Sequence, residues 1–168
     1  MNAPFIPDVK MHISVVVPFR NAEPHLGECI NSLIAQTYPE DRYEIIMVDN
    51  NSTDKSAAIA GSHRRVKLLS ESRPGAYAAR NLAVRYAAGD IIAFINATCV
   101  ASGDWLERIA MAMRPPCITV VQGHCDFANN SFALSALSAY EMEKACFVFF
   151  GRRPGIHWQG LNILTWRT

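Results

Sequence analysis

Short apolar segments alternate with longer segments of helical period through most of this chain, and this alternation restricts the fold more than any other feature of the sequence. Strands are predicted at 13–17, 43–48, 66–70, 91–95 and 118–123. Helices are predicted at about 23–36, 53–60, 76–88 and 104–113. Because strands that alternate with helices form βαβ units, the sequence predicts an α/β fold, Rossmann-like, with a mostly parallel sheet and helices on both faces.

Polar residues and glycines mark the ends of the predicted helices. Ser52, Thr53 and Asp104 precede helical segments and are predicted to cap them, because their side-chain oxygens can accept from backbone N–H groups of the first turn. Gly61 and Gly89 follow helical segments and are predicted to end them.

Length and charge restrict the class of protein. A chain of 168 residues is about one domain and can bury a core of ordinary size. Its 16 Lys and Arg residues and 15 Asp and Glu residues give a formal net charge of +1. Because the bulk charge is near neutral, it favours neither nucleic acid nor an acidic membrane as a partner, and no nucleic-acid partner is predicted.

Cysteine usage indicates a reducing compartment. The five cysteines are odd in number, widely spaced and without a C-x-x-C pair, which favours reduced thiols over disulfides or a zinc site: Cys29, Cys99, Cys117, Cys125 and Cys146. The first segment, MNAPFIPDVKMH, has neither the apolar core of a signal peptide nor that of a spanning helix. A cytoplasmic protein is therefore expected, with peripheral association at the inner face of the membrane left open.

Polar turns follow three of the predicted strands. They are PFRNAEP at 18–24, DNNSTD at 49–54 and NATC at 96–99. Ligands of open parallel sheets bind beyond the carboxyl ends of the strands, so these turns are expected to lie side by side around a ligand. The first turn lacks the glycines of a G-x-G-x-x-G motif, and the chain lacks G-x-x-x-x-G-K-S/T, which argues against a nicotinamide or flavin enzyme and against a Walker-type nucleotide hydrolase.

Several of these motifs occur in the order of a known family. The segments VVVPFRNAEPHLGECINSLIAQTYP, YEIIMVDNNSTDKS and PGAYAARNLAVRYAAGDIIAFINATCVASGDWL, spread over about residues 13–113, resemble the N-terminal part of family 2 glycosyltransferases, and GLNILTW is similar to the family's later G-x-N segment. The resemblance implies a GT-A fold and transfer of a sugar from a nucleotide-diphosphate sugar to a glycan or lipid-linked acceptor hydroxyl, with inversion, in polysaccharide biosynthesis.

The same resemblance implies a set of substrate-binding residues. The P-x-x-N turn would line the base pocket, Asp49 would accept from the base or a ribose hydroxyl, and the G-x-x-x-A-R-N segment would offer a guanidinium to the ligand or to the neighbouring acidic turn. The implied residues are Pro18, Phe19, Arg20, Asn21, Asp49, Asn51, Ser52, Gly75, Arg80, Asn96 and Thr98.

Simpler roles stay open for some of these residues. Asp49, Asn51 and Ser52 are also the residues that a turn between strand and helix uses to satisfy its own backbone. Arg80 could be a structural ion-pair partner, and Phe19 could pack in the core.

The family's metal motif, Asp-x-Asp, falls on Asn96-Ala97-Thr98, so both acidic positions are substituted. In the family these carboxylates hold Mg²⁺ or Mn²⁺ against the diphosphate. A pair of unit charges about 4 Å apart interacts by about 4 kcal/mol at an effective dielectric of about 20, so two lost carboxylates weaken metal binding strongly. Asp90 precedes its strand and is expected at the opposite end of the sheet, whereas Asp104 is expected to cap a helix although it follows the loop closely.

Arginines are the expected alternative to a metal ion at the phosphates. The candidates are Arg20, Arg73, Arg152 and Arg153. A general base is also expected from the resemblance, as an Asp downstream of G-x-N, but no acidic residue follows Glu143. His157 is the remaining titratable base there and is expected to be a loop residue, so no catalytic residue is assigned.

The predicted organisation is an extension at 1–12 and one domain at 13–168. Within it, 13–125 would bind the nucleotide sugar, and 126–168 would begin an acceptor half that is incomplete, with a helix at about 132–149 and a Gly/Pro-broken loop after it. The leading hypothesis is a family 2 glycosyltransferase domain, truncated or degenerate and of uncertain activity. One alternative is a non-catalytic pseudo-transferase that binds a nucleotide sugar or docks on a partner or membrane through FVFFGRR. Another is a different α/β nucleotide-binding protein.

Overall fold

The computed structural model describes residues 11–114, 120–122 and 149–152. Its strands are β1 (Ile13–Phe19), β2 (Tyr43–Asp49), β3 (Val66–Ser70), β4 (Ile91–Phe94), β5 (Val120–Gln122) and β6 (Phe149–Arg152). Its helices are α1 (Glu23–Ile34), α2 (Ser56–Ser62), α3 (Ala76–Tyr86) and α4 (Trp105–Ala112), with a 3-10 turn, η1 (Glu40–Arg42). The extension at 1–12 and the helix predicted at 132–149 lie almost wholly outside the described residues.

The described strands form one sheet in the order β3-β2-β1-β4-β6-β5. The first four are parallel to one another, whereas β6 is antiparallel to both β4 and β5. The predicted α/β fold with a mostly parallel sheet is therefore confirmed. The prediction at 149–152 was wrong, since these residues form β6 and not the end of a helix followed by a loop. Pairing with β4 and β5 supplies the backbone hydrogen bonds that a short helix end would otherwise have made.

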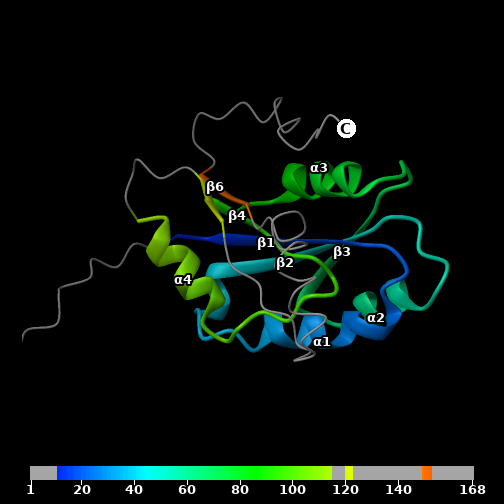
Figure 1. Cartoon of the computed structure of the whole chain (residues 1–168), viewed down its shortest axis with the longest axis horizontal. Coiled ribbons are helices and arrows are strands. Elements are labelled where there is room, and N and C mark those ends of the chain that lie inside the picture. Colours follow the sequence, from blue (N-terminus) through cyan, green and yellow to red (C-terminus); the bar gives the residue numbers. More distant parts are fainter. Residues whose placement is uncertain (1–10, 115–119, 123–148, 153–168) are drawn as a thin grey trace, which may run out of the picture.

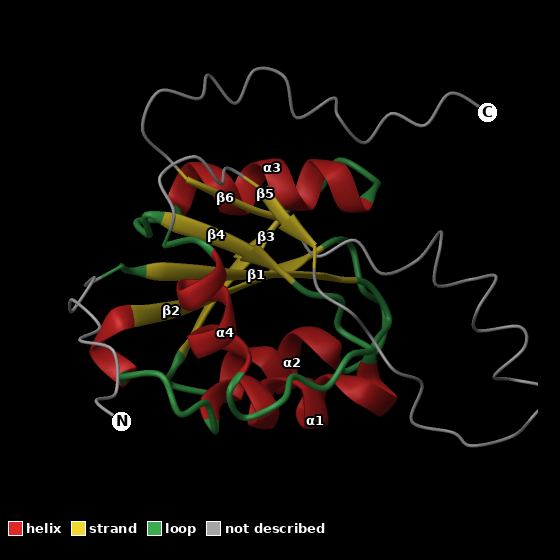
Figure 2. Cartoon of the chain, turned by 60° about the vertical axis from the view of Figure 1, so that its left-hand side comes forward, coloured by secondary structure: helices red, strands yellow, loops and turns green. Residues whose placement is uncertain are grey.

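Helices cover both faces of the sheet, as Figures 1 and 2 show. On one face α1, α2 and α4 enclose the larger core, in which Leu26, Ile30 and Leu33 of α1 pack with alternate residues of the central strands. On the other face α3 packs against a second core through the small side chains of Ala79 and Ala83, and it is the one helix of the described residues on that face. In the described part of the chain, no helix combines the length and the apolar character needed to cross a bilayer.

Pro18 lies in the central strand β1 at a position where its missing N–H does not interrupt the pairing with the neighbouring strands. A proline lacks the N–H that a central strand normally donates. The pairing of β1 with β4 runs only from Ile13 to Val16, whereas its pairing with β2 continues to Phe19. Because the carbonyl of Val16 accepts from Ile95 N and that of Phe19 accepts from Asn50 N, the nitrogen of Pro18 faces the β4 side, beyond the end of that ladder.

The three predicted helix caps make other contacts than expected. The helix predicted from residue 53 begins at Ser56, and neither Ser52 nor Thr53 caps it; its N-cap is Lys55, without a side-chain cap hydrogen bond. The polar residues before it bond to the turn after β1 instead, so contacts between turns override the local signal. Asp104 does occupy the N-cap position of α4, but its carboxylate accepts from Arg108 Nε at 2.7 Å and not from the first turn.

The two predicted helix stops also differ from their expected roles. Gly61 lies inside α2, which ends one residue later, so that prediction was wrong. Gly89 follows the end of α3 by three residues, and its backbone passes close to β1. A side chain there would meet Ser14 N at 2.5 Å and His12 O at 2.9 Å, so glycine is needed for close approach and not to end the helix.

Candidate nucleotide-sugar site

The turns that follow β1, β2 and β4 lie at one rim of the sheet. The strand order places β1 between β2 and β4, and all three run in the same direction. Their carboxyl ends therefore meet at the right-hand side of Figure 1, together with the end of β3. The expectation that these turns are neighbours is thus confirmed, and a strand order that separated them is excluded.

The turns after β1 and β2 are joined by side-chain hydrogen bonds. The backbone N–H of Asn21 donates to Ser52 Oγ at 3.0 Å, and Thr53 N donates to Asn21 Oδ1 at 2.8 Å. Asn21 and Asn51 have positive φ angles of 51° and 61°, a conformation that asparagine tolerates better than most residues. The two turns therefore form one rigid unit.

Further bonds join the same unit to the helices that follow. Ala22 N donates to Ser56 Oγ at 2.8 Å, Glu23 N donates to Asp54 Oδ2 at 3.1 Å, and Lys55 N donates to Glu23 Oε2 at 3.1 Å. Hydrogen bonding from Ser56 lowers the pKa of Asp54. Since these N–H groups bond to protein oxygens, a phosphate at this rim would have to be held largely by side chains.

Asp49 ends β2 in the centre of the rim and is half-buried. Its Oδ1 accepts from Ser52 N at 3.1 Å, which is the turn-capping role considered above. Its Oδ2 accepts no hydrogen bond from the residues that the structure describes. Asn51 beside it is exposed, and its Nδ2 donates to Ser72 O at 2.9 Å. Asp49 therefore caps its turn with one oxygen and has the other available for a ligand.

Pro18 and Phe19 differ from Arg20 in what they present to the rim. Pro18 is buried, and the Phe19 side chain is only 4% exposed and packs in the larger core. The Phe19 ring therefore cannot stack on a base without leaving the core. Arg20 is exposed and makes no ion pair or hydrogen bond with the described residues, so its guanidinium can reach a ligand at the rim.

Glu71 and Arg73 form an ion pair on the connection between β3 and α3. Arg73 Nη2 donates to Glu71 Oε2 at 2.8 Å, and Arg73 Nε donates to Oε1 at 3.1 Å. The Glu71 side chain is 8% exposed, whereas that of Arg73 is 62% exposed. These bonds from Arg73 lower the pKa of Glu71 to about 2, so the pair stays ionised and Arg73 is held at a fixed place beside the rim.

Arg80 lies on α3 and reaches the loop after β4. Its Nη2 donates to Asn96 Oδ1 at 3.2 Å, and its guanidinium lies 5.9 Å from the centre of the Tyr77 ring. Partial burial lowers the pKa of Arg80. The ion pair considered from the sequence is wrong for the described residues, because the partner of Arg80 is the neutral amide of Asn96. Gly75, five residues earlier, begins this helix with a φ of 114°.

The loop after β4 exposes Asn96 and Thr98 and buries Ala97. A row of polar side chains on α1 holds the loop: Cys29 Sγ lies 3.8 Å from Asn96 O, and Ser32 Oγ accepts from Ala101 N at 3.0 Å. Burial raises the pKa of Cys29 to about 12, so this thiol is neutral in the folded protein. The loop is thus fixed from below by α1 and from the side by Arg80.

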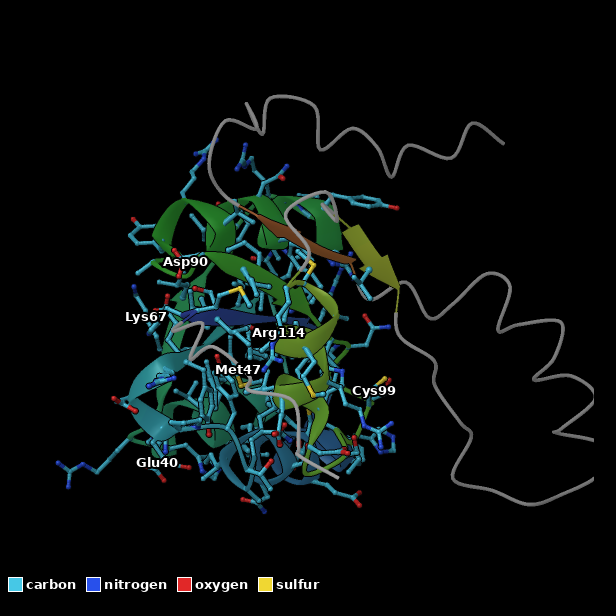
Figure 3. The ribbon with its side chains drawn as sticks, turned by 90° about the vertical axis from the view of Figure 1, so that its left-hand side faces the viewer. Glu40, Met47, Lys67, Asp90, Cys99 and Arg114 are labelled. Atoms are coloured by element: carbon cyan, nitrogen blue, oxygen red, sulfur yellow. The ribbon has the colours of Figure 1, made fainter. Side chains whose placement is uncertain are left out.

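Asn96 and Thr98 do not offer the donor set of a divalent cation. Both contribute neutral oxygens, and Asn96 Oδ1 already accepts from the cationic Arg80. In the described ranges, no three His, Cys, Asp or Glu side chains are grouped as metal ligands would be. Asp104 is paired with Arg108. Asp90 Oδ2 accepts from His12 N at 2.9 Å, and Figure 3, seen from the amino ends of the strands, shows Asp90 well apart from Cys99 on the loop.

Sequence reasoning missed Asn50, which is 4% exposed between Asp49 and Asn51. Its side chain bonds to three backbone groups of the connection between β3 and α3. The sequence did contain a signal for Asn50, because it is a polar residue between Asp49 and Asn51, and both of these were predicted site residues. Arg152 lies in β6, of which only the backbone is described, and Arg153 and His157 lie outside the described residues.

Comparisons with known proteins agree on one family. The model of the family described as glycosyl transferase family 2 matches residues 14–154. The glycosyltransferase AglE of Haloferax volcanii is 32% identical over 120 residues, which is 68% of this chain and 40% of AglE. This chain therefore spans well under half of that relative.

Two solved structures resemble the fold. TarS 1–349 of Staphylococcus aureus in complex with UDP has a TM-score of 0.66 and 26% identity, over 72% of this chain and 37% of that chain. The mannosyltransferase PcManGT from Pyrobaculum calidifontis, in complex with GDP-Man and Mn²⁺, has a TM-score of 0.70 over 88% of this chain and 46% of that chain. At 24% identity, the second likeness shows the fold alone.

Proposed function

Because this chain belongs to glycosyl transferase family 2, we propose that residues 13–125 bind a nucleotide-diphosphate sugar at the rim formed by the turns after β1, β2 and β4. The predicted GT-A fold is confirmed by the likeness to glycosyltransferases of that fold. The observation that carries the proposal is the position of Asp49, which has one carboxylate oxygen available in the middle of a rim made rigid by bonds between turns.

The rim offers different chemistry to the two ends of the ligand. Asp49 Oδ2 would accept from a base N–H or a ribose hydroxyl, a charge-assisted hydrogen bond that is stronger than a neutral one. The diphosphate would lie toward the guanidinium groups of Arg20, Arg73 and Arg80, because the backbone N–H groups of the turns after β1 and β2 bond elsewhere. Asn96 and Thr98 would contact the sugar–phosphate part as neutral partners.

Transfer would place the sugar on a hydroxyl of a glycan or lipid-linked acceptor, with inversion at the anomeric carbon. The acceptor would be bound by the half that begins at about residue 126 and by parts of a longer protein, since the relatives are longer than this chain. In the family, a divalent cation supplies charge stabilisation for the departing diphosphate. The residues at 96 and 98 do not fit that ion, so we propose binding with little metal dependence.

Calorimetric titration with UDP, GDP and their sugars, with and without Mn²⁺, tests this proposal. We expect weak binding of one nucleotide class, and Asp49→Asn should weaken it about ten-fold, because a charged acceptor is lost. The matched control is Asp90→Asn, which removes a carboxylate from the opposite end of the sheet and should leave the affinity unchanged. Failure of every nucleotide to bind the wild-type chain would reject the proposal.

The substituted metal positions favour a second candidate, a non-catalytic protein that binds a nucleotide sugar. Release of free nucleotide from the bound donor, measured with a panel of glycan and lipid-linked acceptors, separates the two functions. Turnover shows an active transferase, whereas binding without turnover in the full-length protein supports the second candidate. In the double variant N96D/T98D, binding that becomes dependent on Mn²⁺ would show that the loop has kept the shape of a cation site.

A further inference from the structure

Side chains of α1, and of the residue two places beyond its end, hold the loop between β4 and α4. Cys29 Sγ lies 3.8 Å from Asn96 O at the start of the loop, and Ser32 Oγ accepts from Ala101 N at 3.0 Å further along it. Gln36 bonds to the last part of the loop. The loop that exposes Asn96 and Thr98 is therefore attached to one helix at its start, its middle and its end.

Gln36 uses its whole amide for this attachment and is only 9% exposed. Its Nε2 donates to Ser32 O at 2.9 Å and to Ser102 O at 2.7 Å, and its Oε1 accepts from Leu106 N at 3.0 Å. The N–H of Leu106 is in the first turn of α4, where backbone donors have no partner within the helix. Because Asp104 does not cap this helix with its side chain, Gln36 supplies the missing acceptor from a distant part of the chain.

The other end of α1 is bonded to the turn after β2. Glu23 N donates to Asp54 Oδ2 at 3.1 Å, and Glu23 Oε2 accepts from Lys55 N at 3.1 Å. Asp54 belongs to the same turn as Asp49. The helix α1 thus connects the turn that carries the acidic group of the candidate site with the loop that carries Asn96.

We propose that Gln36 is a positioning residue, which sets the loop of Asn96 and Thr98 relative to Asp49 and thereby determines affinity for the sugar–phosphate part of the donor. This inference rests on the proposed nucleotide-sugar site. Gln36 touches no ligand in this account and acts through the loop. Its loss should therefore weaken a ligand that spans the rim more than a ligand that reaches only Asp49.

Tyr43 provides a matched control at the same end of α1. It begins β2, is 5% exposed, and its hydroxyl donates to Leu33 O at 3.0 Å and to Ile34 O at 3.3 Å. Both Tyr43 and Gln36 therefore bond to carbonyls in the last turn of α1, but only Gln36 also bonds to the loop after β4. Gln36→Met and Tyr43→Phe each remove buried hydrogen bonds and nearly keep the size of the side chain, and only the first releases the loop.

Calorimetric titration compares wild type, Q36M and Y43F in the whole chain. The probes are UDP-glucose and UMP, or GDP-mannose and GMP if wild type prefers guanine nucleotides. The monophosphate would reach Asp49 but not Asn96 or Thr98. We expect Q36M to bind the sugar nucleotide about five-fold or more weakly than wild type, and the monophosphate less than about two-fold more weakly. Y43F should lose thermal stability but should change both affinities by less than about two-fold.

Hydrogen exchange of the Leu106 amide gives a second measurement, which needs no variant. Coupling between two sites is reciprocal, so a donor that depends on the loop must also stabilise the bond from Leu106 N to Gln36 Oε1. We expect exchange of this amide in wild type to slow at saturating sugar nucleotide, relative to the core amides of β2. The monophosphate at saturation should slow it less.

The outcomes separate this inference from the proposed function. If wild type binds no nucleotide, the proposed function fails and the positioning role fails with it. If wild type binds, but Q36M weakens both probes equally or Y43F shows the same preference as Q36M, then Gln36 is a structural residue and the inference alone is overturned. If Q36M does not fold, exchange at Leu106 in wild type decides, and equal protection by the two probes overturns the inference.

Discussion

At the scale of single residues, buried polar side chains determine the shape of the rim. Asn50, Gln36 and Glu71 are all nearly buried, and each bonds to backbone groups that the sheet and helices leave unpaired. Such groups cost free energy when they are left without a partner, so these side chains stabilise loops that have few apolar contacts. The loops of the candidate site are therefore ordered by hydrogen bonds more than by packing.

The Glu71–Arg73 pair should contribute to stability against acid. Hydrogen bonds from Arg73 lower the pKa of Glu71 from 4.5 to about 2, so the folded state holds this proton less tightly than the unfolded state. The contribution is present above pH about 4.5 and is lost as the pH falls toward about 2. In melting curves between pH 6 and pH 2, we expect the loss of stability to be shallower for Glu71→Gln than for wild type.

The control for this prediction is Glu28→Gln. Glu28 is exposed on α1 and has no hydrogen bond or ion pair with the described residues, so its removal should leave the pH dependence of wild type unchanged. Parallel curves for wild type and Glu71→Gln would contradict the prediction.

Residue roles were the part of the site that the sequence predicted least well. Asp49 and Asn21 stood out because they follow apolar strands, and the structure places both at the rim. Asn50 and Gln36 did not stand out, because all the partners of Asn50 are 21 to 25 residues away in the chain and two of the three partners of Gln36 are 66 to 70 residues away. A hydrogen bond across that separation leaves no local pattern, so only the folded arrangement shows it.

At the scale of helices and strands, the sequence predicted type well and boundaries less well. β1 and β2 are seven residues each and rich in β-branched apolar side chains, which distinguishes them from helices of period 3.6. The start of α2 was placed too early because Ser52 and Thr53 are good caps in isolation. They bond to Asn21 instead, and that contact depends on the position of β1 beside β2.

Replacement by alanine should change stability in opposite directions at two glycines, Gly89 in the connection between α3 and β4 and Gly27 in α1. Gly89→Ala would place a methyl group 2.5 Å from Ser14 N, and because the contact is with backbone, β1 or the turn must shift. We expect it to lower the free energy of unfolding by about 2 kcal/mol or more. Gly27 lies inside α1, and a Cβ added there would have nothing within 4 Å. Gly27→Ala should therefore raise the free energy of unfolding by about 0.5 to 1 kcal/mol.

Urea unfolding of both variants measures the difference directly. Equal changes of the same sign would show that neither helix propensity nor the close approach of Gly89 to β1 decides stability at these positions. Gly27→Ala should leave the sheet unchanged. The far-ultraviolet circular dichroism spectrum of this variant therefore checks that the fold is retained.

At the scale of the whole molecule, one sheet separates two cores. Ile30 of α1 lies in the core beneath the sheet, and Ile46 of β2 lies in the core beneath α3. Each is fully buried, so Ile30→Val and Ile46→Val should each cost about 1 kcal/mol. The two side chains lie in different cores. The free energy of unfolding that the double variant loses should therefore equal the sum of the two single losses to within about 0.5 kcal/mol.

Chemical denaturation of the two single variants and the double variant tests this independence. A coupling energy above about 1 kcal/mol would mean that the two faces repack together through the strands. The overall arrangement was the most predictable feature of the chain, because periodicity determines which residues are buried and the connection rules leave few ways to order parallel strands.

The position of β3 at one end of the sheet has a consequence beyond ligand binding. Among the described strands it pairs with β2 alone, so its outer backbone groups face away from the sheet. Such an edge strand can pair with the same strand of another molecule and start aggregation. Lys67 stands in the middle of β3, exposed, with its Nζ 3.1 Å from Tyr86 O, and a second chain could dock there only by stripping water from that ammonium group. We therefore expect Lys67 to disfavour strand pairing between copies of the protein at high concentration.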